Sequence, residues 1–64
     1  MDREEFKKYL KLYYETLLNR LDNGAAYVDK YPENKNAYKL YREIIQETAE
    51  IERIMDYYGM DKNI

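Results

Sequence analysis

DKYPEN, residues Asp29–Asn34, is the stretch that decides the fold, because a helical chain has to stop and turn there. Pro32 is the only proline in the chain. It disfavours a helical backbone at Tyr31, and it is itself well accepted in the first turn of a new helix. The stretch therefore predicts a turn at about 31–33 that separates two helices.

On the N-terminal side of this turn, apolar residues recur at helical spacing from the start of the chain. Asp2 followed by Glu5 has the pattern of a capping box, which predicts a helix that begins at about residue 3. Charged residues separate the apolar positions, which favours an amphipathic helix over a strand. These apolar positions are Phe6, Leu10, Tyr13, Tyr14, Leu17 and Leu21.

Asn23-Gly24 leaves two interpretations of this segment open. Asn-Gly commonly ends a helix, but a single glycine inside a helix costs only about 1 kcal/mol relative to alanine. One interpretation is a continuous helix over about 3–30. The other breaks the helix near Gly24 and adds a short separate turn over about 25–30, which gives three helices.

On the C-terminal side, the sequence predicts a second helix over about 33–58 and a tail over 59–64. Gly59 suits the left-handed residue that ends many helices, with Met60 placed to contact Met55 in a Schellman motif. The residues of the predicted core stripe of this helix, apolar except for one threonine, alternate strictly by four and three positions. They are Ala37, Tyr41, Ile44, Thr48, Ile51, Met55 and Tyr58.

The apolar stripes of the two helices match when the chain is folded back about Pro32. Each layer then sets a smaller residue against a larger one, as close packing requires. The clearest layers pair Gly24 with Tyr41, Thr48 with Leu17, and Ala37 with Val28. We therefore favour the continuous first helix and predict an all-α antiparallel helical hairpin, a single domain over 1–64.

Composition indicates how such a short chain is stabilised. A domain of this length buries only about 60% of the surface that its unfolded chain exposes. The chain has no cysteine and no histidine, which removes disulfides and most metal sites as further sources of stability. We therefore expect a homo-oligomer, a dimer or higher, that completes a helical bundle such as a four-helix bundle.

Charge and hydropathy argue against several classes of partner. Eleven basic and 13 acidic residues give a net charge of −2, without the basic surface that nucleic acid requires. The N-terminus lacks the pattern of a signal peptide, and no apolar run approaches the roughly 18 residues of a membrane span. We expect a cytoplasmic protein, and its size and composition suggest a phage or mobile-element origin.

The residues that usually carry catalysis are missing. The chain contains no serine, cysteine or histidine, so only threonines, lysines, tyrosines and carboxylates remain. Glu43, Glu47 and Glu50 share one helix face, which we interpret as a solvated acidic face because no Glu-x-x-His pair accompanies them. We predict no enzymatic activity, no metal and no cofactor.

Tyrosine is the unusual residue of this chain, with nine copies and no tryptophan. Tyrosine and arginine are enriched in binding hot spots. Helical spacing gathers several of them on one side of the hairpin, which we call the tyrosine face. It comprises Tyr9, Tyr13, Thr16, Arg20, Tyr27 and Tyr31 of the first helix and Leu40, Glu43, Glu47, Ile54 and Tyr58 of the second. All of these except Thr16 and Glu43 are predicted to bind a partner.

Three functions fit this pattern. The favoured one is a protein–protein interaction module that acts as a regulator, adaptor or inhibitor of another protein. A second is an oligomer that sequesters a small nucleotide-like ligand, since base stacking on an aromatic ring contributes about 1–3 kcal/mol; no glycine-rich phosphate loop is present, however. The third is a purely structural homo-oligomer.

Arg20 falls level with Ile45, so that Glu43 and Glu47 flank it across the hairpin. We predict an interhelical salt bridge, with stacking of the guanidinium on a neighbouring tyrosine as the alternative.

Glu52 projects toward the apolar arc of the second helix. We expect it to be exposed at the edge of the bundle. If it is buried it requires a partner, either Lys7 or a tyrosine hydroxyl within the chain, or a residue of a second chain.

Overall fold

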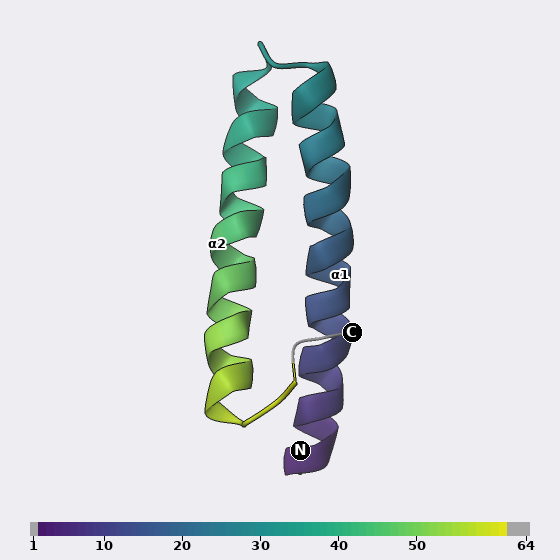
Figure 1. Cartoon of the computed structure of the whole chain (residues 1–64), viewed down its shortest axis with the longest axis vertical. Helices are drawn as coiled ribbons and strands as arrows, with labels where there is room; N and C mark the ends of the chain where they lie inside the picture. Colours follow the sequence, from purple (N-terminus) through teal and green to yellow (C-terminus); the bar gives the residue numbers. More distant parts are fainter. Residues whose placement is uncertain (1, 62–64) are drawn as a thin grey trace.

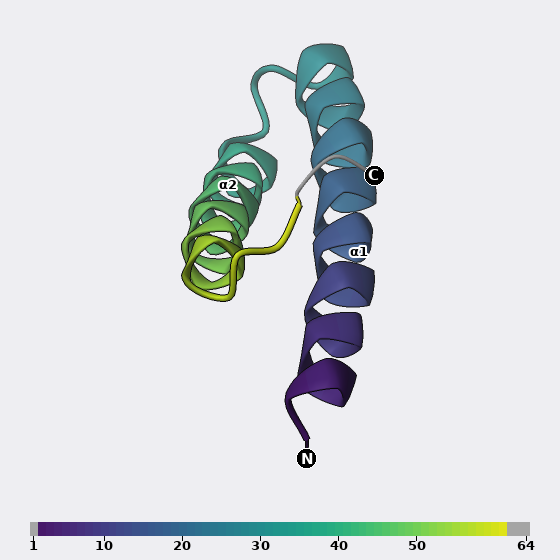
Figure 2. The same cartoon turned by 60° about the horizontal axis from the view of Figure 1, so that its bottom comes forward.

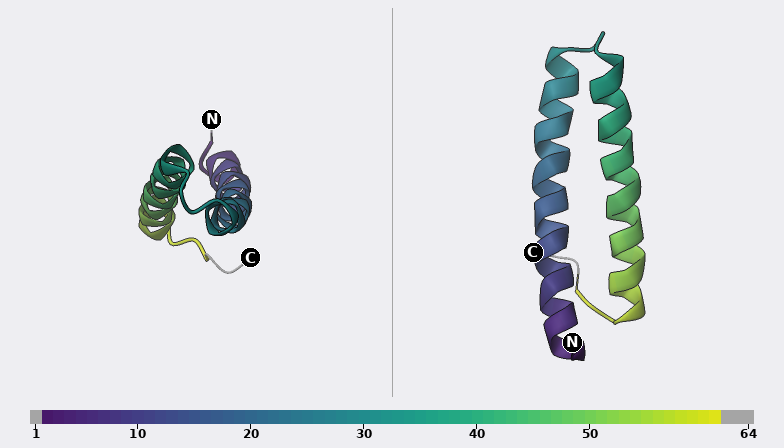
Figure 3. Two further views of the ribbon diagram at one scale, coloured as in Figure 1. Left: turned by 90° about the horizontal axis from the view of Figure 1, so that it is seen from above. Right: turned by 180° about the vertical axis from the view of Figure 1, so that it is seen from behind.

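The computed structural model describes residues 2–61, which form two long helices side by side (Figure 1). Helix α1 spans Arg3–Lys30 and helix α2 spans Lys35–Tyr57. The helices run antiparallel, and the molecule measures 44 × 19 × 16 Å. The described residues form only these two helices, so the hairpin is a single layer, as the views in Figures 2 and 3 also show.

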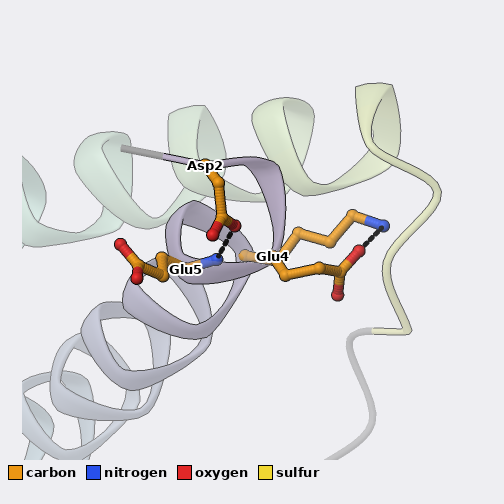
Figure 4. A network of polar contacts seen from close by, with 4 residues as sticks. Asp2, Glu4 and Glu5 are labelled. Carbon is orange, nitrogen blue, oxygen red and sulfur yellow. Dashed lines mark hydrogen bonds and ion pairs between the residues drawn. The ribbon is translucent and has the colours of Figure 1, made fainter.

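Asp2 is the N-terminal cap of α1, as predicted. Its side chain accepts a hydrogen bond of 3.0 Å from the backbone N–H of Glu5 (Figure 4). Glu4 and Glu5 occupy the first turn, where carboxylates stabilise the positive end of the helix dipole. Glu4 also pairs with Lys7, with 3.8 Å between Oε1 and Nζ.

Helix α1 continues through Gly24, so the three-helix interpretation is wrong. A Cβ atom built on Gly24 would lie 2.8 Å from Cδ1 of Tyr41, closer than real side-chain contacts allow. The glycine makes room for the Tyr41 ring, and the predicted pairing of these two residues is confirmed.

The turn differs from the prediction, because α2 begins at Lys35 and not at about Glu33. Asn34 is the cap: its side-chain oxygen accepts a hydrogen bond of 3.0 Å from the backbone N–H of Ala37. The backbone N–H of Asn34 donates to the carbonyl of Tyr31 at 3.0 Å. Pro32 is compatible with a first helical turn, but asparagine is a strong cap, and the helix begins after it.

The C-terminus of α2 is a complete Schellman motif, as predicted. Gly59 has a φ of 67°. The backbone N–H of Met60 donates to the Met55 carbonyl at 2.9 Å, and that of Gly59 donates to the Asp56 carbonyl at 3.0 Å. The motif turns the chain back toward α1 (Figure 2), where Met60 packs against the core.

The core is small and lies toward the open end of the hairpin. Its buried residues are Leu10, Tyr14, Leu17, Thr48 and Met55, with Phe6, Leu18, Ile51, Tyr58 and Met60 partly buried around them. The hydroxyl of Thr48 donates to the Ile44 carbonyl at 2.7 Å, so this buried polar group is satisfied. Nearer the turn, Leu21, Val28 and Tyr41 are only half-buried. The predicted stripes thus pair, but their layers near the turn remain open on their sides.

Candidate protein-binding face

The tyrosine face carries two pairs of tyrosine rings, three of them on α1 and the fourth on the residue that caps its C-terminal end. The rings of Tyr9 and Tyr13 are stacked, with 6.2 Å between their centroids and 16° between their planes. The rings of Tyr27 and Tyr31 lie 4.8 Å apart at an angle of 47°. Each pair is spaced by four residues, which places the rings one helical turn apart on the same side. Arg20 lies on α1 between the two pairs.

The residues predicted to bind a partner differ in exposure. Tyr9, Tyr27, Tyr31, Leu40 and Ile54 are all exposed, with Leu40 at 58% and Tyr9 at 57% of their maximum. Arg20 is exposed, whereas Tyr13, Glu47 and Tyr58 are half-buried. Five of the nine large hydrophobic side chains exposed in the described part of the chain belong to this face. It is therefore the most apolar of the exposed surfaces.

The hydroxyl of Tyr13 donates a hydrogen bond to the carboxylate of Glu47 on α2. The contact joins the two helices along the tyrosine face and holds one member of the stacked pair in place. Its acceptor is one of the two glutamates that were expected to bind Arg20.

The predicted salt bridge of Arg20 is wrong for the single chain. Within residues 2–61, Arg20 forms neither an ion pair nor a ring contact. Glu47 instead accepts from Tyr13, whose hydroxyl is carried on a rigid ring, whereas an exposed arginine loses side-chain entropy for a weak surface pair. Glu43 is also exposed and has no ion pair in the described chain. In the part of the chain that the structure describes, Arg20 and Glu43 thus lie without an ion pair on the same face, and Glu47 has only the neutral hydroxyl of Tyr13 as its partner.

Glu52 is half-buried and not simply exposed, and its partner is the hydroxyl of Tyr14, 2.8 Å from Oε2. This is the tyrosine-hydroxyl alternative, and Lys7 pairs with Glu4 instead. The hydrogen bond to the Glu52 carboxylate, then burial and the negative charge of Glu52, raise the pKa of Tyr14. Tyr13 and Tyr14 are adjacent in the sequence and reach opposite flanks of α2.

An open groove of about 460 Å³ lies beside the tyrosine face near the turn. Its lining includes the two smallest residues of this part of the hairpin, Gly24 on α1 and Ala37 on α2. Its apolar walls are formed by Gly24, Tyr27, Ala37, Leu40, Tyr41 and Ile44. The groove was not predicted from the sequence, although two small residues in neighbouring layers are the pattern that indicates one.

Tyr58, although predicted as a binding residue, is engaged in packing at the open end of the hairpin. Its ring meets that of Phe6 edge-on, with 5.4 Å between centroids, and the guanidinium of Arg3 lies 5.2 Å from its centroid. Tyr57, for which the sequence pattern gave no role, also contacts it at 5.2 Å and is 82% exposed. Tyr58 therefore packs within the chain at the edge of the face, and its role in binding stays a prediction.

Among residues 2–61, no group of three or more histidine, cysteine, aspartate or glutamate side chains is placed to hold a metal ion. Neither α1 nor α2 combines the length and apolar character needed to cross a membrane. Comparison of the chain with protein-family models, with curated proteins and with solved structures found no match.

Proposed function

We propose that this chain is a small, non-enzymatic protein–protein interaction module that acts as a regulator, adaptor or inhibitor of another protein. The observation that carries the proposal is the set of exposed tyrosine rings and aliphatic side chains gathered on the tyrosine face. A tyrosine ring offers a large apolar area with a polar tip, so it is stable in water and gains much when a partner covers it.

The arrangement of the rings also favours binding. Tyr9 and Tyr13 support each other by stacking, and Tyr13 is further held by Glu47. Side chains that are already ordered lose less entropy on association, which raises affinity without adding contacts. Two long helices carry the rings, so the face is presented as a rigid surface.

Self-association belongs to the same proposal. A single layer of two helices buries one stripe of each helix, whereas a stable domain packs at least two layers around its core. A second hairpin supplies the missing layer and forms a four-helix bundle. Sedimentation equilibrium of the purified protein at micromolar concentration is expected to show at least a dimer.

Photo-crosslinking tests the binding function. A benzoylphenylalanine introduced at Tyr27 is expected to capture a target in the native host, whereas the same group at Tyr57, which lies outside the tyrosine face, is not. With the captured target purified, the double substitution Tyr9→Ala and Tyr27→Ala is expected to weaken binding at least about 30-fold, since hot spots contribute about 2 kcal/mol or more.

Tyr57→Ala is the matched control for that experiment, because it removes an exposed tyrosine of the same size from another surface. Equal binding by both variants would contradict the proposal. A thermal-shift screen with nucleotides addresses the alternative of a sequestered ligand: stabilisation of the wild type that is lost in Arg20→Ala would support that alternative instead.

A further inference from the structure

We propose that a second copy of the chain covers the tyrosine face when no target is bound, in a twofold dimer whose axis runs parallel to the helices. Arg20 of each copy then contacts Glu43 of the other. The assignment rests on the function proposed above, because it names an occupant of the same face. Target and second copy therefore compete, and self-association controls access to the tyrosine rings.

The exposed area is the first argument for a dimer. The chain has a solvent-accessible surface of 5191 Å². A compact monomer of 7.9 kDa is expected to expose about 4400 Å². The excess of about 800 Å² is similar to the area that each partner buries in an interface of standard size.

The distribution of apolar side chains indicates which face is covered. Five of the nine exposed large hydrophobic residues lie on the tyrosine face, whereas Tyr38 and Ile45 lie on the opposite face and Leu12 and Tyr57 on the outer surfaces. Burial of apolar area is the main driving force for association. Covering the tyrosine face therefore removes more apolar surface from water than covering another face.

The register of the hairpin sets the level of each charge on this face. Gly24 lies against Tyr41, so in an antiparallel pair Arg20 is level with Ile45, between Glu43 and Glu47. Glu47 already accepts a hydrogen bond from Tyr13. Among the described residues, Arg20 and Glu43 are left as opposite charges without a polar partner, at nearly the same level on different helices.

The positions of Arg20 and Glu43 distinguish between two possible directions of the twofold axis of the dimer. A twofold axis parallel to the helices lays α1 on α2 of the second copy and leaves every residue at its own level, so Arg20 meets Glu43 twice. The same operation sets Tyr27 against Leu40 of the second copy. An axis across the helices at this level would bring Arg20 against Arg20 and Glu43 against Glu43. Charge complementarity therefore selects the parallel axis.

The groove beside Gly24 fits the same arrangement. Leu40 is the most exposed aliphatic residue of α2. At its level the second copy presents Gly24 and Tyr27, which line the groove. Each copy thus offers one protruding leucine and one groove, which makes the face self-complementary.

Charge reversal tests the contact. Arg20→Glu and Glu43→Arg are each expected to raise the dimer dissociation constant at least tenfold in sedimentation equilibrium, because each places like charges together twice. An equimolar mixture of the two variants is expected to regain the wild-type affinity as a heterodimer, since the new acid at position 20 then faces the new base at position 43. Both residues are exposed, so circular dichroism is expected to show unchanged helicity.

The orientation is tested separately, with spin labels. The chain has no cysteine, so Glu33→Cys carries a single nitroxide at the turn. With the parallel axis both turns lie at the same end, and pulsed electron resonance is expected to give a distance well below the 44 Å length of the hairpin. A distance near that length would overturn the proposed axis.

Other outcomes separate the dimer from the function. A monomer at every concentration, or single variants that dimerise like the wild type, overturns the dimer. If the dimer is rejected in this way but the double variant Tyr9→Ala with Tyr27→Ala still loses target binding, the proposed function is supported without the dimer. If the charge variants dimerise more weakly but the double variant Tyr9→Ala with Tyr27→Ala binds the target as the wild type does, the dimer is supported and the proposed function is rejected.

Discussion

At the scale of single residues, Tyr14 is the group whose chemistry is most changed by folding. Its ring is in the core while its hydroxyl donates to the carboxylate of Glu52. The bond needs the protonated phenol, and the pKa of Tyr14 is raised above its ordinary value of 10.0. The unfolded chain therefore loses this proton at lower pH than the folded chain does.

The contribution of the Tyr14 hydroxyl to the free energy of unfolding is therefore fully present below about pH 10, and it is lost as pH rises through the pKa of Tyr14 in the folded chain. Tyr14→Phe is expected to lower the free energy of unfolding at pH 7 by about 1.5 kcal/mol and to weaken its decline above pH 10. Urea unfolding between neutral and alkaline pH measures both effects. Tyr57→Phe is the control, and identical pH profiles for Tyr14→Phe and the wild type would contradict the prediction.

Gly24 gives a second prediction at this scale. Gly24→Ala gains about 1 kcal/mol of helix propensity, but the new methyl group would collide with the Tyr41 ring, and overpacking costs about 1–3 kcal/mol. We expect a net loss of stability in the wild type and a larger loss for Gly24→Leu. In a Tyr41→Ala background, Gly24→Ala is expected to stabilise instead. Chemical unfolding of Gly24→Ala, Gly24→Leu, Tyr41→Ala and the double variant Gly24→Ala with Tyr41→Ala measures these changes in stability. If Gly24→Ala stabilised the chain with Tyr41 in place, the Tyr41 ring would have moved aside freely, and the prediction would be wrong.

At the scale of the helices, three of the four ends are closed by a specific capping residue: Asp2 and Asn34 at the N-terminal ends and Gly59 after α2. Asn34→Ala is expected to lower the free energy of unfolding by about 1 kcal/mol. Asn36 lies two residues further on, in the first turn of α2, and makes no capping bond. Asn36→Ala is therefore expected to change the free energy of unfolding by less than about 0.5 kcal/mol. Urea unfolding compares the two, and equal losses would reject the cap.

These caps and stripes show how much of the fold was predictable from sequence. Spacing and capping chemistry act within a few residues, so the helices, the Schellman motif and the Gly24 layer followed from the sequence. The start of α2 did not, because Pro32 and Asn34 offer competing starts and only backbone geometry decides between them. The predicted salt bridge of Arg20 was wrong for another reason. Helical position gives the direction of a long side chain, but it does not show that a neighbouring tyrosine donates to one of the expected glutamates.

At the scale of the whole molecule, the hairpin is thin. Its buried core lies toward the open end, and the layers near the turn have only half-buried residues. If a second copy completes the structure, folding and association are linked by mass action, and the melting temperature depends on concentration.

Thermal unfolding over a hundredfold range of concentration tests this linkage. Each tenfold rise is expected to add about 1.4 kcal/mol per dimer, which corresponds to several degrees in melting temperature for a domain of this size. Arg20→Glu is expected to lower the melting temperature and flatten its dependence on concentration. A wild-type melting temperature that is the same at all concentrations would show that the hairpin is stable without a second copy.

The adjacent tyrosines Tyr13 and Tyr14 have a mechanical consequence. One is tied to Glu47 on one flank of α2 and the other to Glu52 on the opposite flank. A rotation of α1 about its own axis in either direction stretches one of these ties, so together they resist torque on the helix. Because a continuous helix transmits torsion along its length, this single crossing also sets the direction in which Tyr27 faces, near the far end of α1. Cutting both ties would free α1 to roll against α2, and the direction in which the tyrosine rings point would no longer be set.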